Sequence, residues 1–130
     1  STPVISEKLS IDPAHFKIVR EGMREGALIG SASGLNVEYM KIAAKTGTAE
    51  LGVSKSFVNS WITGFFPYEN PRYAFVVVLE HGPRTNIYGA TFVMRELFDW
   101  MHTNYPKYIA INMGKIIVQN NSIKNFHTVT

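Results

Sequence analysis

The chain has 130 residues, of which 45% are hydrophobic and 18% charged, so it fits one globular domain or part of one and is not composed like a disordered chain. It has no cysteine, which excludes disulfides, thiolate metal sites and a cysteine nucleophile, and no apolar run near the ~20 residues that cross a bilayer, so no membrane contact is expected from this segment. The net charge of +3 comes entirely from the end of the chain, where Lys107, Lys115 and Lys124 have no acidic residue among them, so a basic face that binds nucleic acid is not expected.

The first predicted element is an amphipathic helix over residues 13–25. Asp12 suits the N-cap, and Pro13 suits the first helical position, where a missing N–H does no harm. Apolar residues then recur at helical spacing: Phe16, Val19 and Met23, with Ile18 beside them. Gly26 is expected to stop this helix in a left-handed conformation, and residues 26–38, rich in glycine and serine, are expected to form a loop.

Three strands are predicted next, over residues 39–50, 57–66 and 73–80. Short polar connections separate them, which favours an antiparallel meander. The third segment is a nearly continuous apolar run, which is typical of a central strand buried on both faces.

A second helix is predicted over residues 88–104, and Pro106 marks its end. Its apolar stripe is expected at Phe92 or Val93, Leu97, Trp100 and Met101. Because both helices must bury their stripes against the sheet, the expected fold class is α+β, a helix-covered antiparallel sheet over residues 1–106. Residues 107–130 are an unassigned basic tail, either with a short strand at residues 115–119 or as a frayed extension.

The segment Lys45-Thr46-Gly47-Thr48 carries the most chemical information. On a strand, Thr46 and Thr48 lie on one face, so both hydroxyls can bind a single carboxylate. Gly47 lets a ligand approach the backbone, and Lys45 adds positive charge. If this strand lies at a sheet edge, the backbone N–H of Thr48 can point at a developing oxyanion. These parts would hold an extended, anionic substrate.

The same four residues also fit a plainer interpretation, a strand with a β-bulge and a surface lysine. A phosphate-binding loop is not indicated, because the Gly-x-x-x-x-Gly-Lys pattern is missing. The four histidines are scattered without ligand spacing, so neither a metal nor a cofactor is expected. Glu50 is interpreted as a surface charge, and Arg84 and Thr85 as an ordinary exposed loop that could flank a groove.

The flanking residues indicate a family. The sequence resembles the class B high-molecular-weight penicillin-binding proteins, which are peptidoglycan D,D-transpeptidases. The resemblance covers about residues 10–105 and rests on four segments in the right order: Phe16-Lys17-Ile18-Val19-Arg20-Glu21-Gly22-Met23, the stretch Lys41 to Glu50 around Lys-Thr-Gly-Thr, Trp61-Ile62-Thr63-Gly64-Phe65-Phe66-Pro67-Tyr68-Glu69-Asn70-Pro71, and Tyr73 to Gly82. It implies the C-terminal portion of a transpeptidase domain related to the serine β-lactamases.

The resemblance also implies a mechanism. In this family, the serine of a Ser-x-x-Lys motif attacks the D-Ala-D-Ala end of a peptidoglycan stem peptide, and an amine resolves the acyl-enzyme into a crosslink. β-Lactams acylate the same serine. Carried over to this sequence, Lys45 supplies positive potential, while Thr46, Gly47 and Thr48 bind the substrate or drug. The backbone N–H of Thr48 is then one of two donors in the oxyanion hole.

Two family motifs are absent from these residues, because the sequence contains neither Ser-x-x-Lys nor Ser-x-Asn. The simple expectation is that the chain is a fragment, inactive alone, whose missing N-terminal part is its partner. An uncovered sheet face and strand edge would otherwise favour a homodimer. The parent would be a membrane-anchored cell-wall enzyme at the extracytoplasmic, periplasmic face of a bacterial inner membrane.

Two other functions remain open at this stage. One is a non-catalytic, penicillin-recognising binding or sensor module, which differs in lacking Ser-x-x-Lys upstream. The other is a purely structural or interaction domain.

Overall fold

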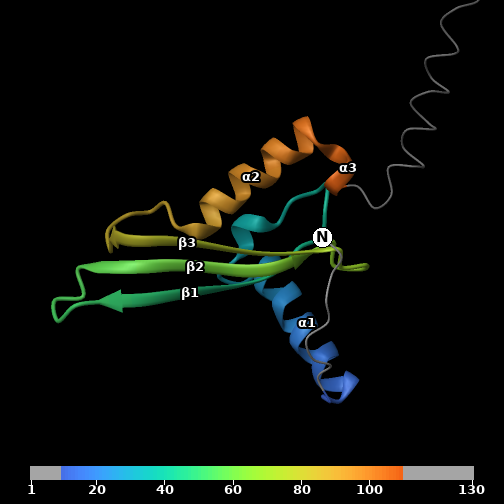
Figure 1. Cartoon of the computed structure of the whole chain (residues 1–130), viewed down its shortest axis with the longest axis horizontal. Helices are drawn as coiled ribbons and strands as arrows, with labels where there is room; N and C mark the ends of the chain where they lie inside the picture. The colour runs from blue at the N-terminus through green and yellow to red at the C-terminus, as the bar shows by residue number, and fades with distance from the viewer. Residues whose placement is uncertain (1–9, 110–130) are drawn as a thin grey trace, which may run out of the picture.

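The computed structural model describes residues 10–109, and Figure 1 shows their arrangement. Two longer helices flank a three-stranded sheet in this part of the chain. In order, the elements are α1 (Pro13–Leu28), the 3-10 turn η1 (Ser33–Leu35), β1 (Ala43–Leu51), β2 (Phe57–Phe66), β3 (Tyr73–Pro83), α2 (Ala90–Asn104) and α3 (Pro106–Ile109). The α+β class and the element order are as predicted, whereas residues 115–119 lie outside the described part.

Helix α1 begins as the sequence predicts and ends later. The Asp12 carboxylate accepts a hydrogen bond from the Ala14 N–H at 2.8 Å, and Pro13 occupies the first turn. Gly26 does not stop the helix, which continues to Leu28. The prediction failed because Gly26 serves packing instead: a Cβ there would lie only 2.8 Å from the Ala44 carbonyl oxygen of β1.

The sheet is antiparallel with the strand order β1-β2-β3, so β2 is its central strand. The prediction that β3 is central and buried on both faces is wrong for the described residues. In β3, Val76 is 64% exposed. The apolar run of β3 therefore indicates that the second face of the sheet is also apolar, and nothing in residues 10–109 covers that face.

The two faces of the sheet differ sharply. On the helix-covered face, Ile62 is fully buried, and Phe75 meets the ring of Phe98 edge-on with 5.5 Å between ring centroids. The opposite face carries Trp61 of β2 and Val76 of β3, and both are exposed. The hydrophobic core thus lies on one side of the sheet only.

Helix α2 packs through a different stripe from the one predicted. Its buried residues are Ala90, Met94 and Phe98, with Met101 packed beside them. Of the residues predicted to pack, Met101 does so, whereas the others are 40–53% exposed: Phe92, Val93, Leu97 and Trp100. Both stripes have helical spacing, and a sequence with apolar residues around most of the helix does not reveal which one meets the sheet.

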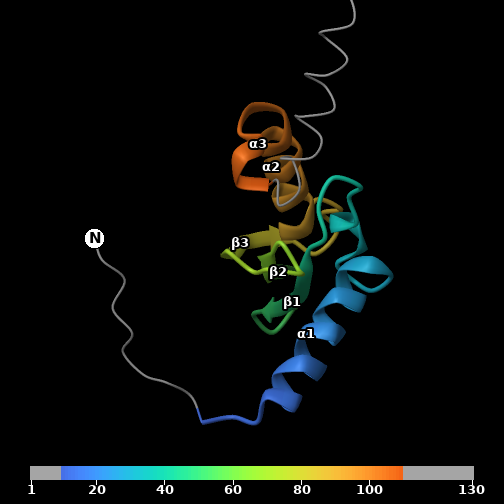
Figure 2. The ribbon, with the colours of Figure 1, turned by 90° about the vertical axis from the view of Figure 1, so that its right-hand side faces the viewer.

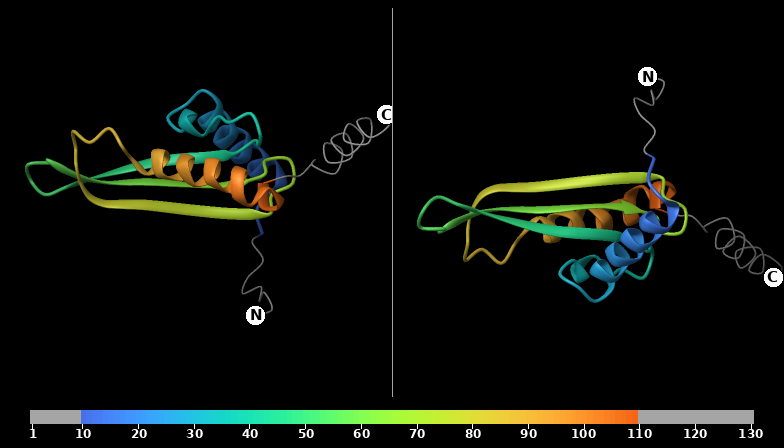
Figure 3. Two further views of the ribbon diagram at one scale, coloured as in Figure 1. Left: turned by 90° about the horizontal axis from the view of Figure 1, so that it is seen from above. Right: turned by 90° about the horizontal axis from the view of Figure 1, so that it is seen from below.

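The helices sit at different places along the sheet. Helix α1 lies beside β1, whereas α2 lies over β2 and β3, as the view in Figure 2 shows. The far end of the β1–β2 hairpin projects beyond both helices, which is clearest in Figure 3. The N-terminal half of α1 is also exposed, including its predicted packing residues Phe16 and Val19. In β1, only the first two residues, Ala43 and Ala44, are buried.

Candidate functional site

The four residues Lys45, Thr46, Gly47 and Thr48 lie in the middle of β1, which is a strand as predicted. Thr46 pairs with Ile62 of β2, and Thr48 with Ser60. Because side chains alternate along a strand, both threonines share the helix-covered face of the sheet, while Lys45 and Gly47 belong to the opposite face. Thr46 is half-buried, and Thr48 is exposed.

The backbone groups of β1 alternate between β2 and the outer edge. The Ile42 carbonyl accepts a hydrogen bond from the Arg24 guanidinium of α1 at 3.0 Å. The Ala44 carbonyl lies against Gly26 of the same helix. Both groups therefore point away from β2, and the twofold repeat of a strand gives the same direction to the backbone N–H and C=O groups of Thr46 and Thr48.

This alternation divides the outer edge of β1 into two parts. Helix α1 covers the edge at Ile42 and Ala44, through Arg24 and Gly26. From residue 46 onward, no strand of the described chain pairs with this edge. The Lys-Thr-Gly-Thr segment thus begins where the cover ends, and the Thr48 N–H faces the open side.

Polar side chains from β1 and from the segment after α1 meet at this opening. The Thr46 hydroxyl lies 2.6 Å from the hydroxyl of Ser31, which follows α1. The Lys45 ammonium donates to the Thr46 carbonyl oxygen at 2.7 Å, so it folds over the edge from the opposite sheet face. A positive charge, two hydroxyls on one face and an outward backbone N–H therefore lie within one short stretch of edge.

Gly47 places no side chain on the sheet surface beside Trp61. A Cβ at this position would lie 3.5 Å from the Cβ of Trp61, which is ordinary contact. The fold therefore has room for a Cβ at residue 47, and packing inside the described chain does not explain the glycine.

The negative charge of Glu50, beside the site, is balanced by two cations. Glu50 is the next residue of β1 on the threonine face, and its carboxylate pairs with Lys55 of the hairpin loop and with Arg84 after β3. Hydrogen bonds from Lys55 and Arg84 hold the pKa of Glu50 below its usual value. Glu50 is thus an exposed charge, as interpreted from the sequence, and its ion pairs with Lys55 and Arg84 offset its negative charge beside the open edge of β1.

The sequence did not single out two serines near this site. Ser60 lies opposite Thr48, but its hydroxyl accepts a hydrogen bond from the Ala90 N–H at 3.0 Å and so caps the start of α2. Ser31 contacts Thr46 directly. Its position in a loop, 15 residues before Thr46, gives no periodic signal that could have revealed the contact.

In residues 10–109, no group of three or more histidine, aspartate or glutamate side chains is placed to hold a metal ion. None of the helices in this part of the chain has the length and apolar character needed to cross a membrane.

Comparison with known proteins gives a consistent assignment. Residues 1–99 match the family described as the penicillin binding protein transpeptidase domain. Among solved structures, the chain is similar to the transpeptidase domain of the FtsI4 D,D-transpeptidase from Legionella pneumophila, with 19% sequence identity and a TM-score of 0.52. That likeness covers 67% of this chain and 37% of the Legionella chain, and at this identity it supports the fold alone. No curated protein matches significantly.

Proposed function

Because the chain belongs to the penicillin-binding-protein transpeptidase family, we propose that it supplies the Lys-Thr-Gly-Thr strand of a serine-type D,D-transpeptidase. This enzyme would crosslink peptidoglycan stem peptides and be acylated by β-lactams. The observation that carries the proposal is the open edge of β1, where Lys45, Thr46 and Thr48 present a cation, two hydroxyls and an outward N–H together.

Each group has a distinct role in the proposed reaction. The hydroxyls of Thr46 and Thr48 donate hydrogen bonds to the terminal carboxylate of the stem peptide or drug, and this fixes the acyl donor along β1. The Thr48 N–H stabilises the negative charge that forms on the carbonyl oxygen during attack. Lys45 adds positive potential beside the carboxylate and the attacking hydroxyl.

We place the nucleophile outside these 130 residues, because they contain no Ser-x-x-Lys. The chain spans 37% of the length of its Legionella neighbour, which leaves room for that motif on another segment. The exposed apolar sheet face around Trp61 and Val76 is a surface on which such a segment can pack. The reaction would then take place at the extracytoplasmic face of a bacterial inner membrane, in a membrane-anchored parent.

A labelled penicillin tests this function. The isolated chain is expected to remain unlabelled, whereas the longer gene product with its Ser-x-x-Lys segment is expected to be labelled stoichiometrically. Replacing Thr46 and Thr48 by alanine in the longer protein should slow acylation by roughly tenfold or more, since each removes a hydrogen bond to a charged group. Thr103→Ala is the matched control, because Thr103 is an exposed threonine on α2 rather than on β1.

Three outcomes would contradict the proposal. Stoichiometric labelling of the isolated chain would place a nucleophile within it. Reversible penicillin binding without acylation by the longer protein would favour a non-catalytic recognition module. Acylation that is equally fast in the Thr46→Ala, Thr48→Ala double variant would favour a purely structural role for β1.

The exposed apolar surfaces also bear on the state of the isolated chain. Val76 and Trp61 lie exposed on one sheet face, and an unpaired strand edge invites pairing with another chain. We therefore propose that the chain alone forms homodimers or requires its missing segment. Light scattering that gives a monodisperse monomer, with high cooperative stability, would contradict this.

A further inference from the structure

We infer that Ser31 is a positioning residue for Thr46: its hydroxyl donates a hydrogen bond to the Thr46 oxygen and thereby commits the Thr46 proton to the carboxylate of the acyl donor. The inference rests on the proposed function and adds a residue to its site. The observation behind it is the 2.6 Å distance between the two hydroxyl oxygens.

The direction of this hydrogen bond follows from the chemistry of the three groups. A hydroxyl has one proton to donate and two lone pairs that accept, whereas an ionised carboxylate only accepts. Thr46 can donate to a carboxylate only when its proton is not already given to Ser31. When substrate is bound, Ser31 must therefore be the donor and Thr46 the acceptor. The resulting chain runs from Ser31 through Thr46 to the carboxylate, and each bond in such a chain strengthens the next.

The backbone around Ser31 is folded tightly enough to hold this geometry. After α1, the chain turns back on the helix end, where the Ala32 N–H donates to the Gly26 carbonyl at 3.0 Å. A Cβ on Gly30 would lie 2.9 Å from the Gly26 Cα, so these two glycines allow the turn to close against the helix. The same Gly26 lies against β1. The position of Ser31 relative to Thr46 is thus fixed by one packed corner, formed by Gly26, Gly30 and the turn after α1.

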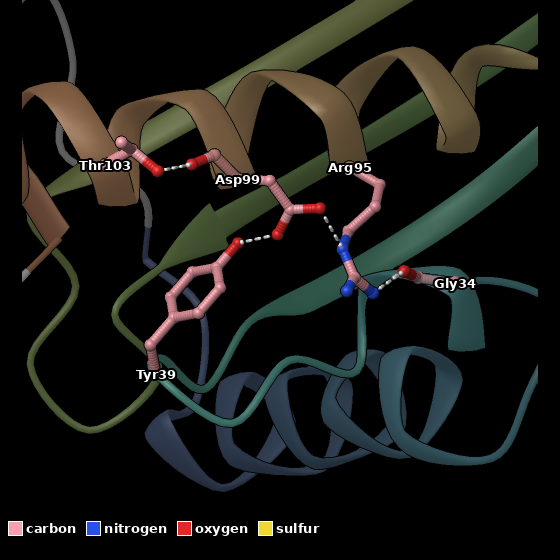
Figure 4. A network of polar contacts seen from close by, with 5 residues as sticks. All are labelled: Gly34, Tyr39, Arg95, Asp99 and Thr103. Atoms are coloured by element: carbon pink, nitrogen blue, oxygen red, sulfur yellow. Dashed lines mark hydrogen bonds and ion pairs between the residues drawn. The ribbon is translucent and has the colours of Figure 1, made fainter.

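A polar network ties the following residues to α2, as Figure 4 shows. The Arg95 guanidinium donates to the Gly34 carbonyl at 3.0 Å and to the Asp99 carboxylate at 2.8 Å. The other oxygen of Asp99 accepts from the Tyr39 hydroxyl at 2.7 Å.

Burial and the Asp99 carboxylate raise the pKa of Tyr39 above its usual value, which favours the protonated hydroxyl that donates to Asp99. The segment that carries Ser31 is therefore fixed at both ends, by Gly26 before it and by α2 after it.

The first test measures position without any reaction. In the longer gene product, three-bond NMR couplings of the Thr46 methyl carbon to the backbone N and C′ report its χ1 angle. We expect a single rotamer in the wild type and in Ser31→Thr, and averaged couplings in Ser31→Ala. Ser33→Ala is the matched control, since Ser33 is an exposed serine of the same loop. Unchanged couplings in Ser31→Ala would overturn the inference.

The second test separates positioning from general damage. In the longer, acylation-competent protein, rates are compared for a penicillin with a free carboxylate and for its methyl ester. Ser31→Ala is expected to slow acylation by the acid about fivefold and to leave the ester nearly unaffected, whereas Ser31→Thr restores the acid rate. An equal loss with both compounds would overturn the inference. A wild-type protein that is not acylated by either compound would contradict the proposed function instead, and the NMR result would still decide the position of Thr46.

Discussion

The packing of α1 against β1 makes a sharp prediction for two glycines in one helix. Gly22 and Gly26 are one turn apart in α1, and a Cβ on Gly22 would meet nothing within 4 Å. A Cβ on Gly26 would lie 2.8 Å from the Ala44 carbonyl oxygen, which is backbone and cannot rotate away. Replacing each glycine by alanine therefore adds the same methyl group at two places. At residue 22 the methyl group enters open space, and at residue 26 it meets the covered edge of β1.

The two substitutions are expected to change the free energy of unfolding in opposite directions. In a helix interior, alanine is favoured over glycine by about 0.8–1 kcal/mol, so Gly22→Ala should stabilise the chain by roughly that amount. Gly26→Ala gains the same propensity, but α1 must move by roughly 0.6 Å to restore 3.4 Å contact with Ala44. Overpacking of this kind costs about 1–3 kcal/mol. The net effect on the free energy of unfolding should be a loss of up to about 2 kcal/mol.

Urea unfolding followed by circular dichroism measures both variants against the wild type. The midpoint should rise for Gly22→Ala and fall for Gly26→Ala, with unchanged slopes. In the Thr46 coupling experiment, Gly26→Ala should also broaden the χ1 distribution, because the displaced corner carries Ser31. The reasoning is refuted if Gly26→Ala raises the midpoint as much as Gly22→Ala does.

Three further variants test the core and the polar network. Phe98→Ala should destabilise the chain by about 3–5 kcal/mol in urea unfolding, because Phe98 is fully buried. Ser60→Ala should cost about 1 kcal/mol in the same assay, since it removes the acceptor of the Ala90 N–H at the start of α2. The Tyr39 hydrogen bond holds the pKa of Asp99 below its usual 3.8, so the Asp99 contribution is complete above that pH and lost as the pH falls through the folded-state value. Asp99→Asn should therefore flatten the acid limb of a stability-against-pH curve, and an unchanged limb would contradict the network.

Local signals in the sequence were enough for the elements and for the position of the motif. The Asp12 cap and the polar breaks between apolar runs act within a few residues, so they predict the start of α1 and the limits of β2 correctly. The Lys-Thr-Gly-Thr segment was expected on a strand for the same reason, and β1 contains it.

Signals that depend on a distant partner were misread. The face of α2 that packs is decided by what Phe98 meets across the sheet, and the stripe through Trp100 has the same spacing. Glycine often ends a helix, but the close approach of the Ala44 carbonyl explains why residue 26 is a glycine. Ser31 could not be predicted at all, because its contact with Thr46 depends on how the loop after α1 turns back.

The division of the β1 edge links these distant contacts to the proposed chemistry. An edge that is open along its whole length would invite another strand, whereas an edge that is covered throughout would leave no place for a substrate. Helix α1 covers Ile42 and Ala44 and stops short of Thr46, and the turn at its end places Ser31 at the border. The helix that protects the edge therefore also leads into the turn that carries Ser31, the residue inferred to orient the Thr46 hydroxyl at the start of the open part. Shifting α1 should thus change stability and substrate orientation together, whereas Ser31→Ala should change orientation alone.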